Sequence, residues 1–149
     1  MVEYRTGDIL TYEGKYICQG VNTLGLMGAG LALQIRNKYP KVWQVYSKKT
    51  LNLGDSFGVD CGKHTILCIA TQKDIGRHKK PFNISAFEIG LDKIDRNISG
   101  PVAFPPIGCG LGGGDFFAVR EVLLRVKNIQ PIVYYLNDEI PDEILKNMC

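Results

Sequence analysis

Segments typical of β-strands alternate along this chain with segments typical of helices, and this alternation restricts the fold more than any other feature. Strands that alternate with helices usually lie side by side in parallel, with helices covering both faces of the sheet. The sequence therefore predicts a three-layer α/β/α fold around a central mixed, largely parallel sheet. The predicted strands are 2–10, 15–22, 101–107 and 131–136, with a hairpin over 55–71, and the predicted helices are 29–40, 41–49, 83–98 and 115–128.

The length and composition fit a single domain over residues 1–149. The chain is 45% hydrophobic and 22% charged, which is typical of a globular protein. Its five cysteines form no C-x-x-C pair, so we expect reduced cysteines and no metal site. The N-terminal segment lacks the apolar core of a signal peptide, and no apolar run approaches membrane length. We expect a cytoplasmic monomer with no cofactor and no membrane partner.

The charge pattern leaves nucleic-acid binding open without indicating it. The formal net charge is +3, and the basic residues are scattered except in the cluster at 77–80.

A glycine-crowded segment, "FPPIGCGLGGGDF" at 104–116, lies between a predicted strand and a predicted helix. Glycines there let backbone N–H groups approach an anion, and the start of the next helix adds a partial positive charge. Gly108, Gly110 and Gly113 match G-x-G-x-x-G, but the lysine and hydroxyl residue of a P-loop do not follow. The segment predicts an anion-binding loop; the alternative is a turn that needs positive φ angles.

A second loop has the same character. A predicted strand ends at Asn22, and Gly25, Gly28 and Gly30 surround the start of a helix near Ala29. Two such loops suggest two surfaces that hold one pyrophosphate. A dinucleotide-binding domain fits less well, because its glycine motif opens the fold rather than the final βαβ unit.

The segments "GDIL" at 7–10, "QGVNTLGLMGAGLALQIRNKYP" at 19–40 and "PPIGCGLGGGDF" at 105–116 together resemble a macro domain, the ADP-ribose-binding module. The order and spacing agree over nearly the whole chain. The resemblance extends to a branch with three kinds of enzyme. These are terminal ADP-ribose-protein glycohydrolases, antitoxins that strip ADP-ribose from DNA, and yeast-type ADP-ribose 1''-phosphate phosphatases.

The resemblance implies roles for named residues. Asp8 would accept a hydrogen bond from the adenine amine, Ile9 would place a backbone N–H beside the base, and Asn22 would orient the distal ribose hydroxyls. The alternatives are a turn residue for Asp8 and a satisfied strand-end asparagine for Asn22. The implied ligand-binding set also contains Gly28, Ala29, Gly30, Gly108, Cys109, Gly110, Leu111, Gly112 and Gly113.

The sequence departs from this family pattern where the chemistry matters. The glycohydrolases carry a Thr-Lys pair after the equivalent of "LCIAT", whereas here Gln72 takes the lysine position and Lys73 follows. Adjacent residues of an extended segment point to opposite sides, so Lys73 would point away from the side that the glycohydrolase lysine faces. We therefore expect water, and not Lys73, to be the nucleophile. Asp115 would position or deprotonate that water, or would only cap the following helix. Asn22 and Asp115 are therefore the catalytic candidates, and a phosphate contact by Lys73 or His78 stays open.

The expected function is hydrolysis at the distal ribose of an ADP-ribose derivative, with ADP-ribose 1''-phosphate as the leading substrate. The alternatives are removal of ADP-ribose from DNA or protein, and a reader that binds ADP-ribose without catalysis. Nucleic acid would enter only as an ADP-ribosylated substrate.

Overall fold

The computed structural model describes residues 1–73, 82–107 and 116–136. In that part of the chain, six strands form one sheet in the order β1-β6-β5-β2-β4-β3. All neighbouring strands are parallel except β3 and β4, which form the predicted antiparallel hairpin. The elements are β1 (Glu3–Thr6), η1 (Ile9–Thr11), β2 (Tyr16–Asn22), α1 (Gly30–Lys38), α2 (Pro40–Tyr46), β3 (Ser56–Asp60), β4 (Thr65–Gln72), α3 (Ile84–Asn97), β5 (Gly100–Phe104), α4 (Phe116–Leu123) and β6 (Ile129–Tyr135).

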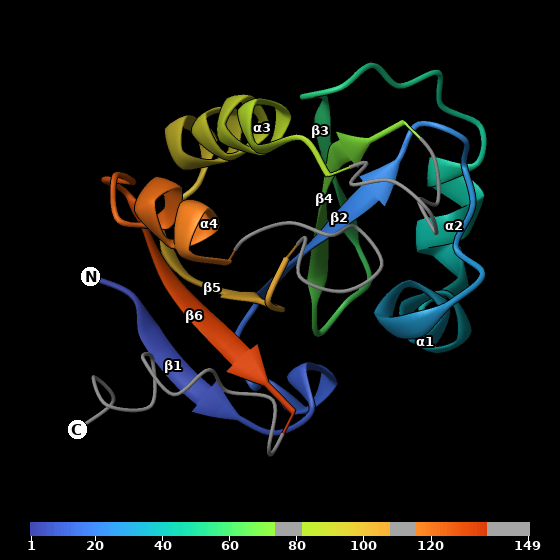
Figure 1. Ribbon diagram of the computed structural model, residues 1–149. Coiled ribbons are helices and arrows are strands. Elements are labelled where there is room, and N and C mark those ends of the chain that lie inside the picture. The colour runs from blue at the N-terminus through green and yellow to red at the C-terminus, as the bar shows by residue number, and fades with distance from the viewer. Residues whose placement is uncertain (74–81, 108–115, 137–149) are drawn as a thin grey trace.

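Helices α1 and α2 cover one face of the sheet, and α3 and α4 cover the other (Figure 1). Successive side chains of a strand point to opposite faces, so one central strand supplies both cores. In β2, Ile17 packs with the α1–α2 core and Cys18 with the α3–α4 core. The predicted three-layer fold with a mixed, mostly parallel sheet is thereby confirmed.

Several boundaries differ from the sequence prediction for local reasons. The first strand ends at Thr6, because Gly7 adopts a φ of +127° and the next residue caps the one-turn helix η1. The helix expected to stop at Pro40 ends at Lys38, and Pro40 begins α2, a position that suits its fixed φ. Helix α4 ends at Leu123, five residues earlier than predicted.

Asp95 joins helix α3 to strand β6. Its carboxylate is only 7% exposed and accepts hydrogen bonds from the backbone N–H groups of Lys127, Asn128 and Ile129 at 2.9, 2.8 and 2.9 Å. Burial by itself raises the pKa of the Asp95 carboxyl, but the three backbone donors outweigh it and the pKa is lowered. A buried anion therefore fixes the end of the α3 layer against the sheet.

None of the helices in the described ranges is both long and apolar enough to cross a membrane.

Candidate functional site

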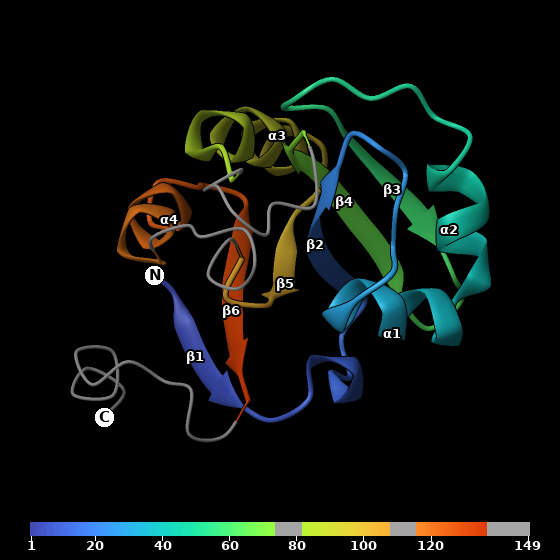
Figure 2. The ribbon, with the colours of Figure 1, turned by 45° about the vertical axis from the view of Figure 1, so that its right-hand side comes forward.

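The strand order places a topological switch point between β2 and β5. From β2 the chain continues through α1 and α2 to β3 and β4 on one side of the sheet. From β5 it continues through α4 to β6 on the other side. Ligands of open α/β sheets bind at such a point, beside the carboxyl ends of the two strands. The two predicted glycine-rich loops follow β2 and β5 in the sequence. Figure 2 shows these two strands side by side.

Asn22 lies at the carboxyl end of β2 and is 7% exposed. Its side-chain Oδ1 accepts hydrogen bonds from the backbone N–H groups of Leu24 and Leu26 at 3.0 and 3.2 Å. Its Nδ2 donates to the carbonyl oxygen of Leu26 at 3.0 Å, and the second N–H of the amide has no partner among the described residues. The side chain thus organises the start of the loop and retains one donor that can face a ligand.

Tyr46, at the end of α2, completes this arrangement and was missed by the sequence analysis. Its hydroxyl donates to the carbonyl oxygen and to Oδ1 of Asn22 at 2.6 and 2.7 Å. The residue has no exposed surface, and burial raises the pKa of Tyr46 to about 12, so the hydroxyl keeps its proton. A tyrosine on the buried side of a short helix resembles an ordinary core residue in sequence, which is why no signal pointed to this role.

Gly28, Ala29 and Gly30 form the entry to helix α1. Ala29 is extended and supplies no side-chain cap, and Gly30 has a φ of +56°, which favours glycine. A Cβ atom built on Gly28 or Gly30 would meet nothing within 4 Å among the described residues. The backbone N–H groups at the start of this helix are consequently open to an anion.

Asp8 is exposed and follows β1, whose end is fixed by a hydrogen bond from the Gly7 N–H to the Tyr135 carbonyl oxygen at 2.8 Å. One oxygen of its carboxylate accepts the Leu10 N–H at 2.9 Å and so caps η1. The other carboxylate oxygen has no partner among the described residues. Ile9 is buried in the α1–α2 core and anchors the segment. Contact of Asp8 and Ile9 with adenine stays a prediction.

Gln72 and Lys73 lie beside the loop that follows β2. Gln72 pairs with Asn22 across the sheet, and the Lys73 carbonyl oxygen accepts the Thr23 hydroxyl at 3.0 Å. The ladder matches Val21 with Ala70 but Asn22 with Gln72, so Thr71 is an extra residue in β4. A bulge shifts the alternation of the residues after it. Simple alternation therefore cannot predict the direction of the Lys73 side chain, although our expectation of a water nucleophile is based on it.

The remaining predicted residues, Gly108 to Gly113, Asp115 and His78, lie outside the described ranges. Their implied roles stay predictions. Within residues 1–73, 82–107 and 116–136, no group of three or more histidine, cysteine or acidic side chains could hold a metal ion.

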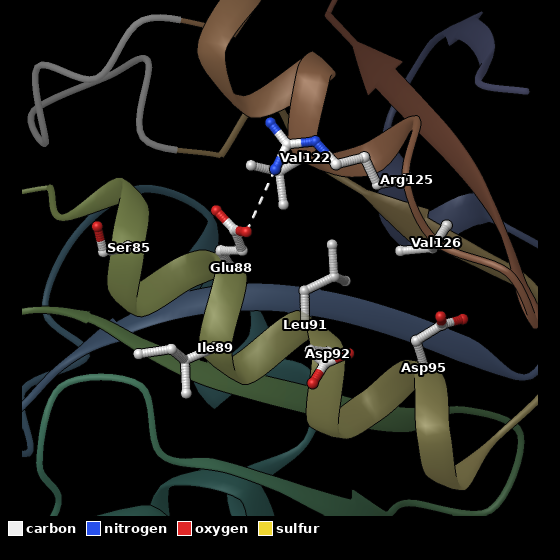
Figure 3. A pocket seen from close by; sticks show the side chains of 9 residues that line it. All are labelled: Ser85, Glu88, Ile89, Leu91, Asp92, Asp95, Val122, Arg125 and Val126. Carbon is white, nitrogen blue, oxygen red and sulfur yellow. Dashed lines mark hydrogen bonds and ion pairs between the residues drawn. The ribbon is translucent and has the colours of Figure 1, made fainter.

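A groove of about 460 Å³ lies elsewhere, along α3 and the end of α4 (Figure 3). An ion pair between Glu88 and Arg125 at 3.2 Å crosses it. None of its lining residues is a predicted site residue, and none lies in the segment directly after β2 or β5. The switch point, where β2 and β5 lie side by side, is the better candidate for the chemistry.

Comparisons with known proteins agree with the fold and the motifs. No family model matches the chain. A DNA ADP-ribosyl glycohydrolase from Mycobacterium tuberculosis is 31% identical over an alignment that covers 90% of this chain and 42% of that protein. The "Macrodomain of Mycobacterium tuberculosis DarG" is 30% identical, covers 90% of this chain and 97% of its own, and superposes with a TM-score of 0.77. "Thermosipho africanus DarTG in complex with ADP-ribose" is 25% identical, covers 96% of this chain and 44% of its own, and has a TM-score of 0.75.

The chain belongs to the macrodomain family, in the branch that contains the DarG macrodomains. The family predicted from the three motifs is thereby confirmed. The chain spans about 42% of the length of the first curated relatives that it matches.

Proposed function

We propose that this macrodomain binds ADP-ribose at the switch point between β2 and β5 and hydrolyses the bond that joins its distal ribose to DNA. The observation that carries the proposal is the open, glycine-lined entry to α1 beside Asn22, at the end of a central parallel strand. Backbone N–H groups at such an entry suit a pyrophosphate, and the Asn22 amide offers an N–H to a ribose hydroxyl.

The relatives shift the order of the expected substrates. From the sequence alone, ADP-ribose 1''-phosphate is the leading expected substrate, because Gln72 occupies the position of the glycohydrolase lysine. Curated relatives from Mycobacterium tuberculosis and Thermus aquaticus are both called DNA ADP-ribosyl glycohydrolase. This supports DNA as the leading substrate and ADP-ribose 1''-phosphate as the second.

A substrate panel tests the proposal. The protein is incubated with ADP-ribosylated single-stranded DNA, ADP-ribose 1''-phosphate and ADP-ribosyl-glutamate peptide, and released ADP-ribose is quantified by chromatography. We expect release from DNA to be the fastest. Tight binding of free ADP-ribose without release from any substrate would contradict the hydrolase and favour a reader.

The same panel separates two mechanisms. If water attacks the anomeric carbon, Lys73→Ala should lower turnover by no more than about tenfold, because one positioning charge is lost. Borohydride treatment during turnover should then leave no ADP-ribose adduct on the protein. If the Lys73 amine is the nucleophile, turnover should disappear and borohydride should trap an adduct on Lys73. Lys127→Ala, which removes an exposed lysine from another segment, is the matched control.

Asp8→Ala should weaken the binding of free ADP-ribose by about 1.5–3 kcal/mol, because a charged hydrogen bond to the adenine amine is lost. Asp8→Asn keeps an oxygen acceptor and the cap on Leu10, and should lose less. Isothermal titration calorimetry measures both affinities. Equal affinity for wild type and the folded alanine variant would remove Asp8 from the site.

A further inference from the structure

The charges of this macrodomain are divided unevenly between its two helical layers. Between Glu13 and Asp55 the sequence contains no acidic residue, and its basic residues there are Lys15, Arg36, Lys38, Lys41, Lys48 and Lys49. On the other layer, the ion pairs of Glu88 with Arg125 and of Asp92 with Arg96 balance the charge. The α1–α2 layer is therefore positive while the α3–α4 layer is mixed.

We define the basic surface as Arg36, Lys38, Lys41, Lys48 and Lys49. None of these side chains forms an ion pair with an acidic residue in the described part of the chain.

Neutral groups orient several of the cations without cancelling their charge. Lys38 and Lys41 donate to the carbonyl oxygens of Leu10 and Asp60 at 3.2 and 3.0 Å. The Arg36 guanidinium lies 4.1 Å from the centre of the Trp43 ring.

The basic surface begins at the candidate site. Tyr46, which holds Asn22, is the last residue of α2, and Lys48 and Lys49 follow it after Ser47. A Cβ atom on Gly25, in the site loop, would lie 3.7 Å from the Cα of Ser47. The Nζ atom of Lys49 lies over the Phe57 ring, 4.9 Å from its centre.

From this end the surface continues along α2 to Lys41. The seven residues of α2 span about 10 Å at 1.5 Å per residue. That length exceeds the spacing of neighbouring charges along one DNA strand, so cations at the two ends of α2 can contact different phosphates.

We propose that the basic surface binds the phosphodiester backbone of the DNA strand whose ADP-ribose enters the site. This inference rests on the proposed function, since it assigns a surface to the same substrate. Unpaired cations attract phosphates and release counterions from DNA, which supplies affinity without reading sequence. Because the cations begin beside the loop that follows β2, they would hold the strand while the ADP-ribose occupies the site.

The test compares two triple variants with the same loss of charge. The surface variant carries Lys41→Gln, Lys48→Gln and Lys49→Gln, and the control carries Lys93→Gln, Arg96→Gln and Lys127→Gln. Fluorescence anisotropy measures the binding of two labelled single-stranded oligonucleotides, one ADP-ribosylated and one unmodified. The measurements are made between about 50 and about 200 mM salt. Calorimetry measures the binding of free ADP-ribose to all three proteins.

We expect the surface variant to bind both oligonucleotides about tenfold or more weakly at the lowest salt concentration. The slope of the logarithm of its association constant against the logarithm of the salt concentration should be shallower by about 2. Each phosphate contact with a single strand contributes about 0.7, and three such contacts are removed. The control should match wild type for the oligonucleotides, and all three proteins should bind free ADP-ribose equally.

Equal loss of DNA binding in the two variants would overturn the proposal, because the overall charge of the protein would then be sufficient to explain DNA binding. Equal competition by polyglutamate would also overturn it, because the surface would then accept any polyanion. Failure of wild type to bind free ADP-ribose would instead contradict the proposed function. The unmodified oligonucleotide would still test the basic surface.

Discussion

Asn22→Ala is expected to weaken ADP-ribose binding about a hundredfold or more, which corresponds to about 2.7 kcal/mol. The wild-type side chain satisfies the N–H groups of Leu24 and Leu26 and the carbonyl oxygen of Leu26. Alanine removes all three bonds and leaves the buried Tyr46 hydroxyl with one acceptor fewer. The loop then loses its preorganised shape, and the ligand also loses the remaining amide N–H. Calorimetry with free ADP-ribose measures the effect.

Two milder variants divide this effect into its parts. Asn22→Asp keeps the acceptor for the loop but cannot donate to the Leu26 carbonyl oxygen or to a ribose hydroxyl. Tyr46→Phe keeps the amide and removes only the donor beneath it. We expect Asn22→Asp to lose more affinity than Tyr46→Phe if the amide touches the ligand. Unchanged affinity in a folded Asn22→Ala protein would leave Asn22 with a structural role alone.

Asp95→Asn is expected to lower the free energy of unfolding at neutral pH by about 2–3 kcal/mol. One acceptor oxygen becomes an NH₂ group that faces backbone donors of the segment at Lys127 to Ile129. Asp92→Asn on the same helix is the matched control, because its carboxylate is exposed and, among the described residues, pairs with Arg96 alone. It should change stability by less than about 0.5 kcal/mol. Urea unfolding measures both.

The same residue gives a pH dependence of known sign. The folded-state pKa of Asp95 is lowered, so its contribution to stability is full above the unfolded-state value of about 3.9. The contribution is lost as the pH falls through the lower, folded-state pKa. Wild type should therefore lose stability below about pH 4 more steeply than Asp95→Asn does. Parallel stability curves for the two proteins at acid pH would contradict this assignment.

Most of the elements and the family could be predicted from the sequence. Period-two and helical patterns are local, so the hairpin at 55–71 and the helix over 83–98 were predicted almost to the residue. The cap of α3 is a local contact as well, since the Asn83 side chain accepts the Ala86 N–H at 2.9 Å. Motifs separated along the chain were sufficient to identify a macrodomain, because their order and spacing are properties of sequence.

The way in which these parts meet could not be predicted from the sequence. Strand order is a property of long-range pairing, and it alone put the loop after β2 at a switch point beside β5. The bulge at Thr71 arises from the pairing of β4 with β2, so strict alternation could not place Lys73. Tyr46 and Asn22 are separated by 24 residues, and the carboxylate of Asp95 reaches donors more than 30 residues away. Such contacts carry no local pattern, because the partner of a buried polar group is set by the packing of whole elements and not by its sequence neighbours.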